Sequence, residues 1–436
     1  MVARKHLKQL VRARMQKTGE SYATARRHIV RTAPQPTIDP TIQWHFPGNV
    51  PATTALRVVI SHAGIRAPHT DEPFSEALLF GIAGGIGAGC CSFYYEKEGF
   101  ASFHLAGRHR WIDDLGYLAD ACEQLGAKTA VHETSGAKTA EKKLLEVLER
   151  GPCIAWVDMA HLPHRAMPAR YSGGGYHVVT IYRTGDDEQS VLIGDLTDEP
   201  IAVSLKDLAT ARGRIKKQKC RLLCVTKTSG QIDLQSRIRN GLQLCHDGLA
   251  QQKWKMFTLE AFRTWGERLH GSKDKESWDR VFAPGNRAWR GLVSAYDCIE
   301  HYGTGGGLCR PLYADFLAEA SEALKDRKLA KVAGQYEKIG QAWTALAHAA
   351  LPNEVPLFHE AKNLCAEKSE LTAAGAPAEQ IRAIWDRLDE LERNARDEFP
   401  LTDAAYDKLR ADLQQQVRSV YEQELAAHAA LGNYLA

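Results

Sequence analysis

The fold is decided by one stretch of the sequence, Phe74-Ser-Glu-Ala-Leu-Leu-Phe-Gly-Ile-Ala-Gly-Gly-Ile-Gly87. Here a glutamate leads into an apolar turn, and four glycines follow within seven residues. Two later segments belong with it. They are Gly175-Tyr-His177, where a histidine opens a strand-like run, and Gly194-Asp195, which follows the next such run. The pattern predicts a buried site assembled from distant parts of the chain.

Composition excludes several classes of protein. The chain has 436 residues, of which 44% are hydrophobic and 25% charged, as in ordinary soluble proteins of two or three domains. Its net charge of +3 is too small to imply a nucleic-acid or membrane partner. It has no apolar run of the roughly 20 residues that span a bilayer, and its basic start lacks the apolar segment of a secretory signal. Ten cysteines without a regular framework favour a reducing cytoplasm.

The sequence divides into four predicted regions. Residues 1–33 form a basic helical arm, and residues 34–52 a proline-rich linker. Residues 53–228 form a mixed domain, and residues 229–436 a helical domain. We expect the arm to dock on an acidic face of its own protein or to be a tail. Nucleic-acid binding is the weaker alternative, because the arm has almost no aromatic residues.

The order of elements predicts an α+β fold for the mixed domain. Helical patterns come first and strand patterns gather late, which favours an antiparallel sheet over alternating βαβ units. The β-rich runs are Cys153–Val157, His177–Arg183, Ser190–Ile193 and Leu222–Thr226. From residue 230 onward the pattern is helical, and the last three helices have the spacing of a solvated bundle. Packing, binding a protein partner and homo-oligomer assembly all remain open for these helices.

His177 and Asp195 form the first candidate site. Side chains eighteen residues apart can meet in an antiparallel hairpin, where an aspartate fixes the tautomer of a histidine that acts as a general base. Spacing alone fits a structural histidine equally well. The neighbouring thiols Cys90 and Cys91 are candidate nucleophiles, with buried structural thiols as the alternative.

Two other kinds of site find little support. The glycines after Glu76 match neither a Walker loop nor a strand-first GxGxxG, so they predict a tight turn rather than a nucleotide site. Asp158, His161 and His164 could ligate a metal, but their spacing fits no strong motif and Pro163 interrupts helical geometry. We therefore predict neither a metal nor a cofactor.

Taken together, these segments resemble a known family. The matching pieces are Thr53-Thr-Ala-Leu-Arg57, Ser75 to Gly81 with Gly84-Gly85-Ile-Gly87, Gly151-Pro152, Leu162-Pro163, Tyr176-His177-Val-Val and Gly194-Asp195. Over roughly residues 45–225 the chain resembles the N-terminal domain of the butirosin biosynthesis protein H family. Residues 230–350 resemble the uncharacterised helical domain that often follows it, most clearly at Gly305-Gly-Gly-Leu-Cys-Arg310.

The resemblance implies a papain-like α+β fold and acyl transfer. In the family chemistry a thiolate takes an aminoacyl group from a carrier-protein thioester and passes it to an amine. His177 and Asp195 match the base and its orienting acid. The nucleophilic cysteine and the histidine before it fall at Pro51 and Val50 of this sequence, so both are replaced. Beside the cleft we expect substrate contacts from Glu76, Gly84, Gly85, Tyr176 and Asp158.

Three explanations of the replacement follow. Cys90 or Cys91 supplies the thiol from a neighbouring loop, the His177–Asp195 pair acts without a covalent step, or catalysis is lost and a binding cleft remains. The sequence thus supports two function classes. One is an acyltransferase-like or amide-forming protein of specialised metabolism, acting on a small molecule or an acyl carrier protein. The other is an inactive relative that binds a small molecule, carrier protein or partner chain.

Overall fold

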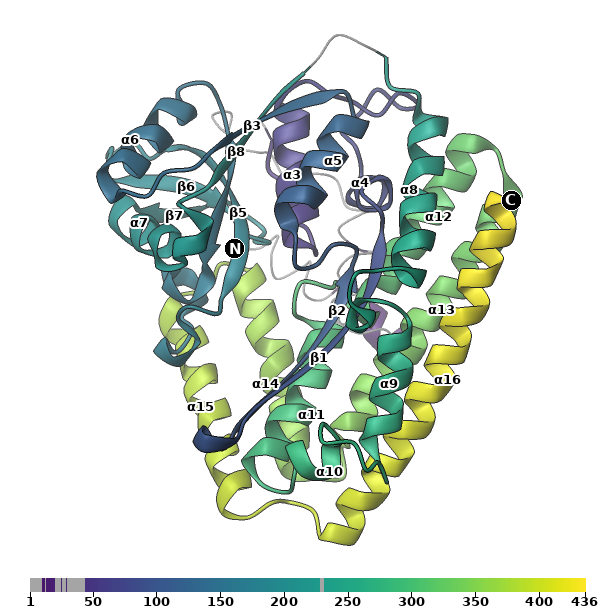
Figure 1. Cartoon of the computed structure of the whole chain (residues 1–436). Helices are drawn as coiled ribbons and strands as arrows, with labels where there is room; N and C mark the ends of the chain where they lie inside the picture. The colour runs from purple at the N-terminus through teal and green to yellow at the C-terminus, as the bar shows by residue number, and fades with distance from the viewer. Residues whose placement is uncertain (1–9, 12, 20–24, 26–28, 30–43, 228–230) are drawn as a thin grey trace.

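The structure is a computed structural model that describes residues 10–11, 13–19, 25, 29, 44–227 and 231–436. A six-stranded sheet, a long hairpin and a layer of helices make up this part of the chain (Figure 1). Most of the predicted arm and linker lie outside the described residues, so the expectations for the arm stay predictions.

The main sheet is antiparallel throughout, in the order β3-β8-β4-β5-β6-β7. This arrangement, followed by a helical region, confirms the predicted α+β class. The four predicted strands are β4, β5, β6 and β8, and the sequence pattern misses the two short or edge strands β3 and β7. The bounds are β3 Ala127–His132, β4 Cys153–Asp158, β5 Tyr176–Thr184, β6 Ser190–Gly194, β7 Ile201–Ser204 and β8 Leu222–Lys227.

Helices cover both faces of this sheet (Figure 1). Helices α3 (Pro51–His62) and α5 (Asp114–Gln124) lie on one face, and α6 (Ala137–Leu148) and α7 (Leu205–Arg214) on the other. Helix α3 is buried along most of its length, which explains its apolar sequence. Pro51 fits at its start, because the first helical residue needs no backbone N–H.

The stretch that decides the fold forms helix α4 (Glu76–Ile82) and the start of a hairpin, β1 (Ile86–Tyr95) with β2 (Phe100–Arg108). Ser75 caps α4 by accepting a hydrogen bond from the Leu78 N–H at 2.9 Å. Between helix and strand the chain turns at two glycines in the left-handed region. The sequence does not predict this hairpin, because glycines interrupt the apolar alternation of its first strand.

The remaining helices form a layer beside the hairpin (Figure 1). Their bounds are α8 Leu234–Ala250, α9 Glu260–Leu269, α10 Trp278–Val281, α11 Asn286–Glu300, α12 Arg310–Leu324, α13 Arg327–Ala350, α14 Pro356–Ala373, α15 Ala378–Asp397 and α16 Asp403–Leu435. A single apolar core runs from α3 and α4 through the hairpin into these helices. The predicted boundary near residue 228 stays a prediction, because this core passes across it.

Candidate functional site

Asp195 is the centre of a buried polar cluster at the end of strand β6. Thr180 of β5 pairs with Gly194 of β6, which places Asp195 diagonally from His177 on the same face of the sheet. His177 Nε2 lies 2.5 Å from Asp195 Oδ1. The structure thus brings together the predicted base and its orienting acid.

Two more side chains reach Asp195 from the short turn Pro163–Arg165. Arg165 donates from Nε to Oδ2 at 2.8 Å and from Nη2 to Oδ1 at 2.5 Å, and His164 Nε2 lies 2.7 Å from Oδ2. Burial alone would raise the pKa of the Asp195 carboxyl, but the charge of Arg165 and the contact with His177 lower it well below its usual range. Asp195 is therefore an ionised carboxylate surrounded by donors.

These contacts decide where the proton of His177 lies. An ionised carboxylate only accepts, so Nε2 is the donor in the contact with Asp195, and Nδ1 of a ring protonated only at Nε2 is an acceptor. Nδ1 makes no hydrogen bond to the described residues, which leaves it available as a base. However, Asp195 already forms an ion pair with Arg165. It therefore stabilises a protonated His177 ring less than an unpaired aspartate would.

Glu76 holds the start of helix α3. Its Oε1 accepts hydrogen bonds from the backbone N–H of Asn49 at 2.8 Å and of Val50 at 2.9 Å. Oε2 accepts from the Asn49 side chain at 3.0 Å. These internal contacts fix the turn that leads into Pro51, and the predicted substrate contact of Glu76 remains untested.

Gly84 and Gly85 serve the backbone rather than a ligand. Their φ values are +99° and +61°, and a Cβ atom on either would lie within 3 Å of His109 or Tyr313. They let helix α4 turn into β1 while packing closely on the helical layer. Neither glycine lines the cavity described below, so their predicted substrate contact finds no support in this geometry.

Asp158 and Tyr176 lie at the paired ends of β4 and β5. Asp158 is fully buried and accepts hydrogen bonds from the N–H groups of Ala160 at 3.1 Å and Gly173 at 2.6 Å. Tyr176 points outward, with Lys217 Nζ 4.4 Å from the centre of its ring. Asp158 shapes the loops beside His177, and the predicted substrate contacts of both residues remain untested.

The structure does not bring Cys90 or Cys91 to His177. Both lie on strand β1, and Cys91 Sγ is 3.9 Å from Met256 Sδ. Neither thiol hydrogen-bonds to His177, whose Nε2 lies against Asp195 and Arg165. Burial raises the pKa of the Cys91 thiol to about 11, and burial raises that of Cys90 well above its usual value. Since the reactive form is the thiolate, this geometry argues against a nucleophile shifted to either residue.

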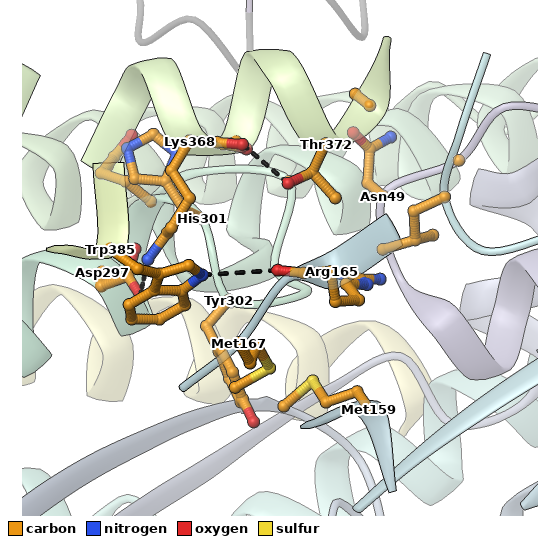
Figure 2. A pocket seen from close by; sticks show the side chains of 16 residues that line it. Asn49, Met159, Arg165, Met167, Asp297, His301, Tyr302, Lys368, Thr372 and Trp385 are labelled. Carbon is orange, nitrogen blue, oxygen red and sulfur yellow. Dashed lines mark hydrogen bonds and ion pairs between the residues drawn. The ribbon is translucent and has the colours of Figure 1, made fainter. Parts of the chain in front are cut away.

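A cavity of about 140 Å³ adjoins the cluster. Figure 2 shows Arg165, Met159 and Asn49 on one side, with His301, Lys368 and Trp385 from the helical layer facing them. Trp385 Nε1 donates to the Arg165 carbonyl at 3.4 Å. Arg165 is therefore shared between the Asp195 cluster and the cavity wall.

The far wall of the cavity is rich in acceptors. Asp297 Oδ2 accepts from Lys368 Nζ at 3.4 Å, whereas the buried Asp297 Oδ1 has no hydrogen-bond partner among the described residues. The same holds for His301 Nδ1. Burial lowers the pKa of His301 to about 4, so its ring is neutral at pH 7. Glu300 adds a second carboxylate to this wall.

Comparison with known families assigns both parts of the chain. Residues 51–196 match the family described as Butirosin biosynthesis protein H, N-terminal. This match assigns the N-terminal region to the family that the sequence resembles. Residues 204–398 match the domain of unknown function DUF4872, which confirms the predicted order of the two regions. A comparison with curated proteins gives no match.

The cavity lies between the two matched regions of this butirosin biosynthesis protein H relative. Met159, Arg165 and Leu196 come from the first region, and the acceptor wall comes from the second. Backbone contact supports the junction, because the Asp198 N–H donates to the Ala373 carbonyl at 2.7 Å. A ligand in the cavity would therefore contact both.

Sequence reasoning missed the residues that join the two parts, notably Arg165, Asp297, His301 and Lys368. One signal was present: the run Gly303-Thr-Gly-Gly-Gly307 begins two residues after His301, and its glycines adopt positive φ. Such a run allows two backbones to approach closely. The others are ordinary charged residues on a loop or helix, and nothing in their local pattern marks them.

The described part of the chain shows neither a metal-binding cluster nor a membrane-spanning helix. Within residues 44–227 and 231–436 and the few described residues before them, no group of three or more His, Cys, Asp or Glu side chains is arranged to hold a metal. None of the helices in the described part of the chain combines the length and hydropathy needed to cross a bilayer.

Proposed function

We propose that this protein binds a small amine-bearing molecule in the cavity between its two regions and that it has lost the covalent step of acyl transfer. The observation that carries the proposal is Asp297 Oδ1, a buried acceptor on the cavity wall without a partner among the described residues, beside the equally unpartnered His301 Nδ1. Buried acceptors without donors are costly, so a ligand that supplies donors gains free energy on binding.

Charge favours the same kind of ligand. The cavity and the adjoining cluster hold three carboxylates, on Asp195, Asp297 and Glu300. The cations are Arg165, which pairs with Asp195, and Lys368, which pairs with Asp297. An ammonium group would be attracted by the Asp297 carboxylate, whose Oδ1 has no hydrogen-bond partner among the described residues, whereas a carboxylate would be repelled.

The size of the cavity limits what it holds. Its volume of about 140 Å³ is well below the roughly 300–1,000 Å³ of sites for drug-sized ligands. A small amine fits, as does an aminoalkyl arm of a larger molecule. The biosynthetic family supports a metabolite as the source of such an arm.

The loss of the covalent step rests on Pro51 and on the positions of the thiols. At the start of α3, where the resemblance places the nucleophile, a pyrrolidine ring occupies the position. The two thiols considered as replacements lie on strand β1 and have raised pKa values. Binding without covalent catalysis is consistent with both observations.

Calorimetric titration with 1,4-diaminobutane tests the proposal. We expect binding to the wild-type protein, no binding of butyrate, and a loss of about tenfold or more in affinity for Asp297→Asn, because a hydrogen bond to a charged group is worth about 1.5–3 kcal/mol. Asp389→Asn, outside the cavity, should bind as wild type. Equal affinity in Asp297→Asn and wild type, or preference for butyrate, would overturn the proposal.

A second candidate, amide formation without a covalent intermediate, is favoured by the geometry of His177. Its free Nδ1 could take a proton from an attacking amine while the amine nitrogen bonds to a thioester carbonyl carbon. The C–S bond then breaks, and the proton passes to the leaving thiolate. The 2.5 Å contact with Asp195 would hold the ring in place.

An acyl N-acetylcysteamine thioester with 1,4-diaminobutane tests this candidate by mass spectrometry of the amide. We expect His177→Ala to lower the rate by about 100-fold, the lower end of typical general-base contributions. A rate in the wild-type protein no higher than in buffer contradicts it, and so does an unchanged rate in His177→Ala.

A further inference from the structure

The long hairpin carries an exposed aromatic face. Opposite residues of an antiparallel pair share a face, as do alternate residues along a strand. Tyr95 pairs with Phe100, and Phe93 stands two residues before Tyr95, so the three rings lie on one face. The other face carries Phe103, which is fully buried against the helical layer. The hairpin therefore has one face packed on the helical layer and one largely open face, on which Arg290 Cζ lies 4.6 Å from the centre of the Phe100 ring.

The open face continues at the base of the hairpin onto the short helix Lys255–Phe257. Cys91 belongs to the same face, and its Sγ lies 3.9 Å from Met256 Sδ. Trp254 precedes this turn. We call the set of five side chains the hairpin face, and they are between 40% and 54% exposed: Phe93, Tyr95, Phe100, Trp254 and Met256.

Such a surface is unusual for a region that stays in water. Aromatic residues and methionine are enriched in the centres of protein interfaces, and Trp and Tyr dominate binding hot spots. In Figure 1 the hairpin runs as a long arm past α9 and α11, and its tip lies beside the lower part of α15. The face thus stands clear of the cavity and the Asp195 cluster.

Charge on the hairpin face is polarised along its length. Glu96 and Glu98 lie exposed at the tip, with Lys97 between them. Lys253 and Lys255 lie exposed at the base, beside Trp254. Six residues of strand separate Gly89, at the base, from Tyr95, so the acidic and basic ends are about 20 Å apart.

We propose that the hairpin face pairs with the same face of a second copy of this chain, with the two hairpins antiparallel about a two-fold axis. This arrangement sets the acidic tip of each copy against the basic base of the other and buries the aromatic side chains between them. An isologous contact needs such a self-complementary surface. A partner of uniform charge would oppose one end of the face.

The area agrees with a small dimer interface. Aromatic side chains present roughly 150–250 Å² each, so five half-exposed side chains offer on the order of 400 Å² per copy. A standard interface buries about 800 Å² per partner. The aromatic centre therefore supplies about half of that area, and the charged ends and the exposed hairpin backbone extend it.

Sedimentation velocity over a dilution series of the full-length protein tests the proposal. We expect a reversible dimer in the wild type. Tyr95→Ser with Phe100→Ser should weaken dimerisation by about tenfold or more, as expected for hot-spot side chains. Both side chains are exposed, so the fold should persist, which circular dichroism verifies. Val131→Ser, at an exposed position on edge strand β3, should leave dimerisation unchanged.

Charge exchange tests the antiparallel arrangement itself. Glu96→Lys with Glu98→Lys places like charges at both contacts of a homodimer, and so does Lys253→Glu with Lys255→Glu. Each variant alone should dimerise weakly, whereas an equimolar mixture restores opposite charges at both ends and should dimerise as wild type. A monomeric wild type at every concentration, or a mixture no better than the separate variants, overturns the proposal.

Discussion

Two arginine–carboxylate pairs, Arg310–Glu424 and Arg165–Asp195, lie in contrasting surroundings. Arg310 Nε donates to Glu424 Oε1 at 2.6 Å in the helical layer, where both side chains are fully buried. Arg165 binds Asp195 through two donors beside the cavity, and its side chain is 17% exposed. One pair is sealed within the core, and the other opens onto a space that a ligand can enter.

The surroundings of each pair indicate its role in the molecule. Around the sealed pair, Trp343 Nε1 donates to Glu424 Oε1 at 2.8 Å, and nothing of the pair reaches a cavity. Its effect is on the packing of α12, α13 and α16. The open pair positions two histidines and forms part of the cavity wall. Similar chemistry is therefore structural in one place and available to a ligand in the other.

The largest effect should come from breaking the sealed pair. Glu424→Gln leaves the Arg310 guanidinium buried without its counter-charge. We therefore expect the free energy of unfolding, measured by urea denaturation, to fall by about 3–5 kcal/mol. The double variant Arg310→Met with Glu424→Leu removes both charges and should lose much less. Equal losses in the single and double variants would show that packing, rather than charge, sets the cost.

A pH effect of about 3 kcal/mol should come from His301, beside the open pair. Its pKa is about 4 in the folded protein against 6.5 for an ordinary histidine, a difference worth about 3 kcal/mol. Because the folded pKa is the lower one, this contribution is full above pH 6.5 and is lost as the pH falls toward 4. The unfolding free energy of the wild type should therefore fall relative to that of His301→Asn on acidification. Parallel pH profiles would contradict this.

Breaking the open pair, Arg165–Asp195, should lower the free energy of unfolding by less than breaking the sealed pair, Arg310–Glu424. Asp195→Asn leaves Arg165 with a partly exposed guanidinium that the cavity can solvate, so we expect a loss of about 2 kcal/mol at pH 7. The pKa of Asp195 is depressed, so its contribution is present above about pH 4 and is lost on further acidification. Urea denaturation at pH 7 measures the loss of stability, and the same measurement at pH 3 shows whether the difference from wild type has disappeared. A loss as large as that of Glu424→Gln would remove the distinction between the pairs.

The sequence predicts elements with strong local patterns and misses those that depend on distant partners. Helix α3 and strands β4 and β5 follow from dense apolar runs. The hairpin from Ile86 is missed, because its strands are specified by the helical layer that covers only one face. The His177–Asp195 contact is predictable because both residues belong to one hairpin.

The rest of the candidate site is not predictable, because it depends on how the two regions pack. Asp297 and His301 are separated from His177 by more than a hundred residues, and no local pattern relates them. Glu76 shows the opposite difficulty for sequence reasoning. It stands in a conspicuous motif, yet its carboxylate is occupied by the backbone of Asn49 and Val50.

The smallest effect should come from an ion pair on the rim of the junction. Arg170 binds Asp389 of helix α15 with both side chains partly exposed, and such pairs are typically worth less than about 1 kcal/mol. Asp389→Asn should therefore change urea stability by less than about 1 kcal/mol and should leave diamine binding unchanged. Added salt should reduce even this difference, because dissolved ions screen exposed charges. They do not reach the sealed pair. A large loss would mean that α15 is held on the sheet by this rim contact rather than by the buried side chains of the junction.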